Sequence, residues 1–186
     1  MKRFILKIVA LCTPVFVSAN VVLPSVFSDN MVLQRNAPVK LWGWSQPNEE
    51  ITVTTSWDNK EYKIKGSNQA TWKLTLQTPG AGGPYTVKFK GYNEVTLNNV
   101  MLGEVWLCSG QSNMEWTPNA GITGGEAEIA KANYPNIRFF SVPKLTAKNP
   151  QDNLPGNWQQ CTPETMKHFS AIGYFFAQRL QEDLKG

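Results

Sequence analysis

The sequence predicts two structural units in series. Residues 20–100 are expected to form a small antiparallel β-sandwich, Ig-like or jelly-roll-like in class, and residues 101–186 the first part of an α/β domain. Three observations support this division. Short runs alternating apolar with polar residues recur about every ten residues up to residue 100. An apolar run then leads into small polar residues, and beyond it helix-like and strand-like patterns alternate.

Residues 1–19 have the pattern of a secretory signal peptide. Lys2 and Arg3 precede a mostly apolar run, and small residues end that run at Ala19. The run is too short to span a bilayer and contains Lys7, so we expect no membrane anchor. The pattern therefore predicts a secreted or periplasmic protein.

The composition is typical of a globular protein. The chain has 186 residues, of which 41% are hydrophobic and 17% charged, enough to bury a core. Without the three basic residues of the leader, 15 basic residues remain against 14 acidic ones, a net charge near +1. No basic run remains, so no nucleic-acid partner is indicated. A single histidine and few cysteines give no metal-binding pattern, and no cofactor is implied.

Six segments of the first unit are predicted strands, each with apolar residues on one face and Lys or Thr on the other. The stretches between them are rich in Gly, Asn, Asp and Pro, which favour turns. The predicted strands are residues 39–43, 51–55, 62–65, 72–76, 85–90 and 95–97.

Four tryptophans in this region allow two interpretations. Large aromatic side chains dominate small cores, and we expect Trp42 and Trp72 to pack inside. Exposed rings could instead stack on sugars, and Trp57, in a predicted turn with Asp58, is the best candidate for exposure. Trp44 completes the set. A non-catalytic carbohydrate-binding or structural module is therefore one possible function.

The second unit has a different pattern. Residues 105–108 are expected to form a buried strand. A short helix is predicted over residues 127–132, after a capping box formed by Thr123 and Glu126. Residues 137–142 are predicted to form a second strand, parallel to the first if the helix is a crossover.

The last helix is predicted over residues 170–184. Its apolar stripe repeats at helical spacing and is expected to be buried against a sheet. The stripe consists of Ile172, Phe175, Phe176, Leu180 and Leu184. Cys108, inside the predicted buried strand, and Cys161 are expected to be free thiols rather than a disulfide.

Ser112 follows the predicted strand at residues 105–108 and is the candidate nucleophile. At the carboxyl end of a strand, a serine on a tight turn can present its hydroxyl to a substrate while its N–H faces the same point. The alternative is that Ser109, Ser112 and Asn113 simply form a polar strand-to-helix turn.

A resemblance to a known family favours the first interpretation. The segment Gly110-Gln-Ser-Asn-Met114, preceded by Gly103-Glu-Val-Trp106 and followed by Glu115-Trp116, resembles the first conserved block of bacterial sialate O-acetylesterases, in the SGNH (GDSL-like) hydrolase superfamily. Residues 23–34 resemble that family's N-terminal opening, and residues 169–176 resemble the helix that leads into its second block.

The resemblance implies a flavodoxin-like three-layer SGNH domain and hydrolysis of acetyl esters on a sugar such as sialic acid. Ser112 would be the catalytic nucleophile, and Gln111 and Asn113 would hold the turn or touch the substrate. An acetyl xylan esterase is the nearest alternative enzyme.

The family's catalytic base comes from an Asp-x-x-His block late in the chain, and this sequence contains no such block. The one histidine, His168, follows Glu164 by four residues instead. A serine hydroxyl needs an adjacent base to become a good nucleophile. The resemblance therefore predicts an N-terminal fragment with little activity of its own.

Overall fold

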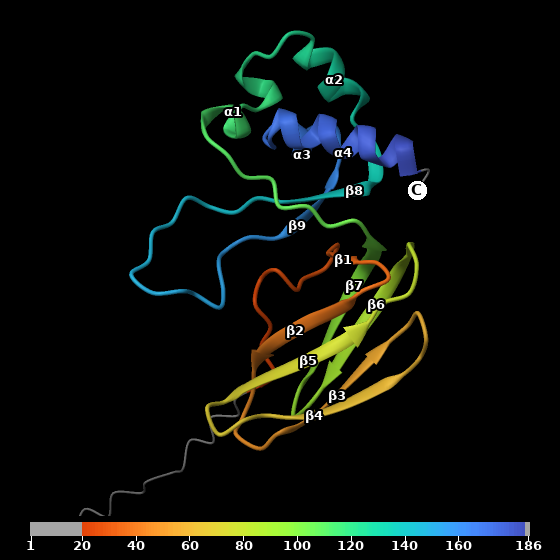
Figure 1. Cartoon of the computed structure of the whole chain (residues 1–186), viewed down its shortest axis with the longest axis vertical. Helices are drawn as coiled ribbons and strands as arrows, with labels where there is room; N and C mark the ends of the chain where they lie inside the picture. Colours follow the sequence, from red (N-terminus) through yellow and green to blue (C-terminus); the bar gives the residue numbers. More distant parts are fainter. Residues whose placement is uncertain (1–19, 185–186) are drawn as a thin grey trace, which may run out of the picture.

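The computed structural model of the chain describes residues 20–184, so the predicted signal peptide lies outside the described residues. This part of the chain is mostly β (Figure 1). Seven strands precede residue 104, and the helices follow it. No helix among the described residues is long and apolar enough to cross a membrane.

The seven strands form two sheets. The larger sheet has the strand order β1-β7-β6-β3-β4, and the smaller one pairs β2 with β5. Strand β1 runs parallel to β7 and the other neighbours are antiparallel, so the larger sheet is mixed. The strands are β1 (Val32–Gln34), β2 (Pro38–Trp44), β3 (Glu50–Thr55), β4 (Glu61–Lys65), β5 (Thr71–Gln77), β6 (Gly82–Lys90) and β7 (Glu94–Gly103).

Both sheets contribute to one hydrophobic core. Leu41 and Leu76 of the smaller sheet and Val53, Phe89 and Val100 of the larger one are all buried in it. The period-2 alternation predicts which residues these are, because successive side chains of a strand point to opposite faces. All six predicted strands are present, but the sheets are not antiparallel throughout as predicted, because β1 pairs parallel with β7.

Beyond the sheets, short helices lie beside a strand pair (Figure 1). Strand β8 pairs antiparallel with β9. A second, smaller core lies between this pair and the helices, with Phe139, Cys161 and Tyr174 buried in it. The elements are α1 (Ser112–Glu115), the 3-10 turn η1 (Pro118–Ala120), α2 (Gly125–Lys131), β8 (Tyr134–Phe140), β9 (Trp158–Cys161), α3 (Pro163–Met166) and α4 (Ala171–Leu184).

The predicted buried strand at residues 105–108 is wrong. Strand β7 ends at Gly103, and the next residues are irregular and exposed, with Leu107 87% exposed. No strand among residues 20–184 pairs with them, and an apolar run forms a strand only where a partner strand is available. Residues 137–142 were predicted to pair parallel with residues 105–108. This pairing is also wrong, because β8 pairs antiparallel with β9 instead. No three-layer α/β domain is seen within the described residues.

Helix α2 occurs where it was predicted, but the capping box is wrong. The N-cap is Gly124, in the left-handed conformation with φ 72°, and no side chain caps the helix. Gly124 adopts this conformation without the steric cost of a Cβ, so the helix begins at Gly125, two residues beyond Thr123.

Helix α4 is also present, but its predicted buried face is wrong. Ala171 and Tyr174 are buried, whereas Ile172, Phe176 and Leu184 are between 41% and 48% exposed. The face that packs inward is the one that meets the small core beside β8 and β9, and a two-stranded sheet is too narrow to cover the predicted stripe.

Candidate functional site

Ser112 lies at the first position of helix α1, exposed to solvent. Backbone hydrogen bonds close the turn: the N–H of Met114 donates to the Gln111 carbonyl oxygen over 2.9 Å, and that of Trp116 to Asn113 over 3.3 Å. Gln111 is the N-cap, but its side chain does not cap the helix. The turn is therefore held by the backbone, and the three polar side chains face solvent.

Gly110 allows the chain to pass close to helix α1. A Cβ at this position would lie 2.6 Å from Cγ of Met114, so the methionine would have to move. Helix α1 in turn is tied to the start of α4, because the N–H of Ala171 donates to the Trp116 carbonyl oxygen over 2.9 Å. These contacts fix the end of the segment that carries Ser112.

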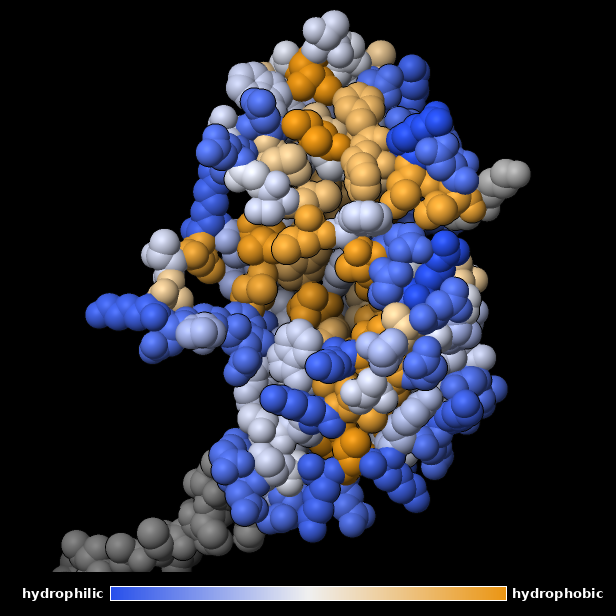
Figure 2. Space-filling model, viewed as in Figure 1, coloured by the Kyte–Doolittle hydropathy of each residue, from blue (hydrophilic) through white to orange (hydrophobic). Residues whose placement is uncertain are grey.

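An apolar groove lies beside Ser112. The groove has a volume of about 290 Å³. Two of its lining rings, those of Trp106 and Phe176, pack edge to face with their centroids 5.2 Å apart. Apolar side chains gather on one face of the molecule between the helices and the sheets (Figure 2). The groove is lined by Trp106, Leu107, Cys108, Ser109, Met114, Ile172, Gly173 and Phe176.

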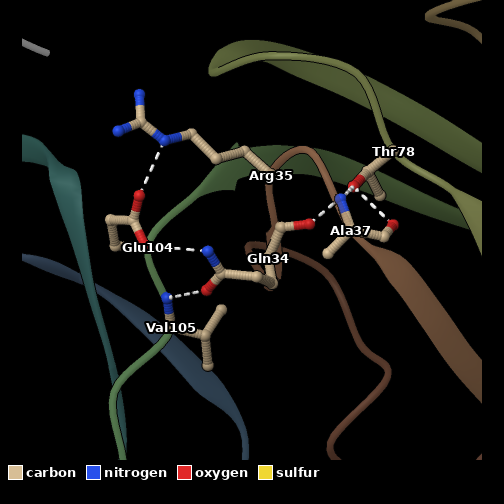
Figure 3. A network of polar contacts seen from close by, with 6 residues as sticks. All are labelled: Gln34, Arg35, Ala37, Thr78, Glu104 and Val105. Carbon is tan, nitrogen blue, oxygen red and sulfur yellow. Dashed lines mark hydrogen bonds and ion pairs between the residues drawn. The ribbon is translucent and has the colours of Figure 1, made fainter.

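A polar network holds the start of the same segment (Figure 3). The Glu104 carboxylate accepts hydrogen bonds from Gln34 Nε2 at 2.8 Å and from Arg35 Nε at 2.7 Å. These two donors hold the pKa of Glu104 below its ordinary value, because they stabilise the charged form. Glu104 is therefore ionised at neutral pH.

His168 makes no hydrogen bond to Ser112. It is exposed, and its backbone N–H donates to the Thr165 carbonyl oxygen over 3.3 Å. The carboxylate of Glu164 pairs instead with Lys167 at 2.6 Å. Within residues 20–184 the Ser112 hydroxyl has no base hydrogen-bonded to it. The structure thus places Gln111, Ser112 and Asn113 in one turn and gives His168 no hydrogen bond to that turn.

The two cysteines among the described residues are free thiols, as predicted, but Cys108 is exposed rather than buried. Its exposure follows from the missing strand at residues 105–108. Burial raises the pKa of the Cys161 thiol to about 11. No group of three or more His, Cys, Asp or Glu side chains among the described residues could hold a metal ion.

The two thiols should differ strongly in reactivity. We expect N-ethylmaleimide at neutral pH to label Cys108 at least a hundredfold faster than Cys161, because the thiolate is the reactive form and Cys161 is both shielded and protonated. Peptide mass spectrometry after timed quenching measures the two rates separately. Equal rates in the folded protein would contradict the burial of Cys161, and labelling in denaturant is the control.

None of the four tryptophans considered as a sugar platform is fully exposed. Trp57 is partly buried and packs edge to face against Tyr85 at 5.8 Å, contrary to the exposure expected of it. Trp72 is buried, as predicted. The exposed tryptophans are Trp106 and Trp116, at 59% and 51%, and they flank Ser112. Their place in the sequence, just before and just after the Gly110–Met114 motif, could have identified them as candidate site residues.

Comparisons with known proteins relate the chain to esterases. No protein-family model matches it. It is 29% identical over 180 residues to human sialate O-acetylesterase, and 28% identical over 179 residues to the mouse protein. These alignments cover 87% of this chain but only 34% and 33% of the relatives, so the chain spans about a third of their length.

A solved structure is similar over most of the chain. The crystal structure of a carbohydrate acetylesterase from Xanthomonas citri matches with a TM-score of 0.83 and 40% sequence identity. The match covers 88% of this chain and 38% of that one. The chain is therefore a distant homologue of sialate O-acetylesterases and shares its fold with part of a bacterial carbohydrate acetylesterase.

Proposed function

We propose that this homologue of the sialate O-acetylesterases carries the nucleophile segment of a carbohydrate O-acetylesterase, with Ser112 as the nucleophile. The observation that carries the proposal is the structural match to the Xanthomonas citri carbohydrate acetylesterase over 88% of the chain. The exposed Ser112 hydroxyl, on a backbone-held turn beside a groove, fits this role.

The reaction follows from the position of Ser112. Its Oγ attacks the acetyl carbonyl carbon, the sugar oxygen leaves with a proton, and an acetyl-serine forms; water then cleaves this ester and releases acetate. As the first residue of a helix, Ser112 has a backbone N–H with no intrahelical acceptor. That N–H is available to stabilise the tetrahedral oxyanion, a contribution of about a hundredfold or more per donor.

The proton of the serine hydroxyl requires a base, and no base within residues 20–184 is hydrogen-bonded to it. We assign that base to a histidine outside this sequence, in the part of the enzyme corresponding to the remaining length of the relatives. The chain would thus be the N-terminal part of the active unit and nearly inactive alone. The signal-peptide pattern of residues 1–19 supports a secreted or periplasmic location for the enzyme.

The substrate is an acetylated sugar, and sialic acid is the first choice because the curated relatives are sialate O-acetylesterases. Since backbone hydrogen bonds already close the turn, the side chains of Gln111 and Asn113 are free to contact that sugar. Trp106 and Trp116 flank Ser112 in the sequence and are both exposed, and aromatic rings of this kind are suited to the apolar face of a pyranose.

A chimera tests the proposal. Residues 20–184 of this chain replace the matching 38% of the Xanthomonas citri enzyme, which supplies the rest of the catalytic unit. We expect the chimera to hydrolyse p-nitrophenyl acetate and O-acetylated sialic acid, and Ser112→Ala to lower kcat at least a thousandfold. Ser141→Ala, at an exposed serine that does not line the groove, should leave kcat within about threefold.

Two outcomes would contradict the proposal. An active Ser112→Ala chimera would remove Ser112 from the chemistry. Full activity of the isolated chain, lost in His168→Ala, would show that the base lies within this sequence. Parallel assays on acetylated xylan distinguish the alternative substrate, because a preference for xylan by kcat/KM would overturn the assignment to sialic acid.

A further inference from the structure

The end of strand β1 lies directly beside the chain that leads to Ser112. In the parallel pairing of β1 with β7, Gln34 is opposite Gly103, the last residue of β7. The backbone N–H of Arg35 donates to the Gly103 carbonyl oxygen over 2.9 Å. The topology therefore brings Gln34 next to the point where the chain leaves the sheet, although the two are far apart in sequence.

Both the nitrogen and the oxygen of the Gln34 side-chain amide form hydrogen bonds (Figure 3). Its Nε2 donates to Oε2 of Glu104 over 2.8 Å, and its Oε1 accepts from the backbone N–H of Val105 over 2.9 Å. Because the ionised carboxylate of Glu104 can only accept, it orients the NH₂ group toward itself and leaves Oε1 facing Val105. One side chain thus holds Glu104 and Val105, the first two residues of the segment by which the chain leaves β7 (residues 104–111, here called the exit segment).

Gln34 is itself anchored to the β-sheets. The backbone carbonyl oxygen of Gln34 accepts a hydrogen bond from Oγ1 of Thr78 over 2.6 Å, and Thr78 is only 2% exposed. The backbone N–H of Ala37 donates to the same Oγ1 over 3.1 Å, which fixes the turn after β1. Gln34 is therefore a rigid support, held from the side opposite the exit segment.

Beyond Val105 the segment has few other attachments. Residues 106–110 make no hydrogen bond within the described residues. The next backbone hydrogen bonds are those that close the turn at Gln111. The stretch carrying Ser112 is thus held at its start by Gln34, at Trp106 by the ring of Phe176, and at its end by the packing of α1 on α4.

We propose that Gln34 is a positioning residue, which orders the segment from Glu104 to Ser112 by holding Glu104 and the Val105 N–H together. Its catalytic consequence rests on the proposed function. A displacement of about 1 Å at a reacting group can lower a rate about a hundredfold, so a fixed start to this segment serves an exposed nucleophile.

Hydrogen exchange followed by mass spectrometry tests the ordering without requiring turnover. In the full chain, Gln34→Ala should raise the exchange rate of the Val105 amide about tenfold, because the Val105 N–H loses its acceptor. Gln34→Glu should raise it by a similar factor, because the new carboxylate repels that of Glu104. Exchange in the rest of β7 should change less than twofold. Gln77→Glu, at an exposed glutamine at the end of β5, is the matched control and should change neither.

A double variant that exchanges the residues at positions 34 and 104, called the swapped pair below, separates the positioning role of Gln34 from a general loss of packing. In the double variant Gln34→Glu with Glu104→Gln, the amide at position 104 donates to the carboxylate at position 34, which still accepts from the Val105 N–H. We expect this variant to return exchange at Val105 to within about twofold of the original. Unchanged exchange in Gln34→Ala, or no recovery in the swapped pair, would overturn the proposal.

The chimera described above supplies the catalytic readout. Gln34→Ala should lower kcat about a hundredfold with little change in KM, and the swapped pair should recover most of the loss. An inactive parent chimera would count against the role of Ser112, whereas the exchange measurement still decides the role of Gln34. Altered exchange with an unaltered kcat in an active chimera would refute positioning.

Discussion

Replacing Phe89 with alanine should lower the free energy of unfolding by about 3–5 kcal/mol. The ring is fully buried in strand β6, opposite Val53 in the register of β3. Its centroid lies 5.6 Å from that of Trp72, which belongs to the other sheet. The substitution removes buried apolar surface and leaves a cavity between two sheets that cannot close without disturbing both.

Urea denaturation followed by tryptophan fluorescence measures this loss, because Trp72 reports on the same core. Tyr92→Ala is the matched control: Tyr92 is 71% exposed in the turn after β6, and its loss should cost less than about 0.5 kcal/mol. A loss below about 1 kcal/mol for Phe89→Ala would mean that the two sheets do not share a tightly packed core.

Replacing Glu49 with alanine should lower the free energy of unfolding by about 2–5 kcal/mol. Its side chain is fully buried, and it joins two loops: Oε2 accepts from the Gln46 N–H at 2.8 Å and Oε1 from the Tyr92 N–H at 2.7 Å. Alanine would remove both acceptors. The N–H groups of Gln46 and Tyr92 would then lose the acceptor that joins their loops, and the loss of a bond to a charged acceptor costs more than the loss of an average hydrogen bond.

The neighbouring Glu50 offers a direct comparison. It is exposed at the start of β3, and Glu50→Ala should cost less than about 1 kcal/mol. Glu49→Gln keeps one acceptor oxygen and should lose about half as much stability as Glu49→Ala. Equal stabilities of the Glu49→Ala and Glu50→Ala proteins, measured by urea denaturation, would show that the two loops are held by other contacts.

The local pattern of the sequence predicted the strands of the two sheets. In β3 the alternation of Glu50, Ile51, Thr52 and Val53 specifies which face is buried, and the structure buries Ile51 and Val53. Such predictions succeed because the period of side chains along a strand is a property of the backbone itself. Strand β1 was missed, since its three residues are too few for alternation to be recognised.

The same approach placed Ser112 at a turn leading into a helix, because small polar residues after an apolar run favour a turn. It also predicted the free thiols and the helices α2 and α4. It failed for residues 105–108, whose composition is that of a strand but which have no partner strand among residues 20–184. It failed again for the buried face of α4, since Tyr174 packs inward while Ile172 and Phe176 stay exposed.

The sequence by itself determined the elements whose pattern is local: the alternating strands of the sheets, the turn at Ser112 and the extent of helix α4. Only the tertiary structure decided which strands pair, which face of α4 is buried, and that Gln34 contacts Glu104 and Val105. Those outcomes depend on residues as far as 71 positions apart meeting in space. Periodicity and propensity carry information over a few residues only, whereas pairing and burial depend on what the rest of the chain brings alongside.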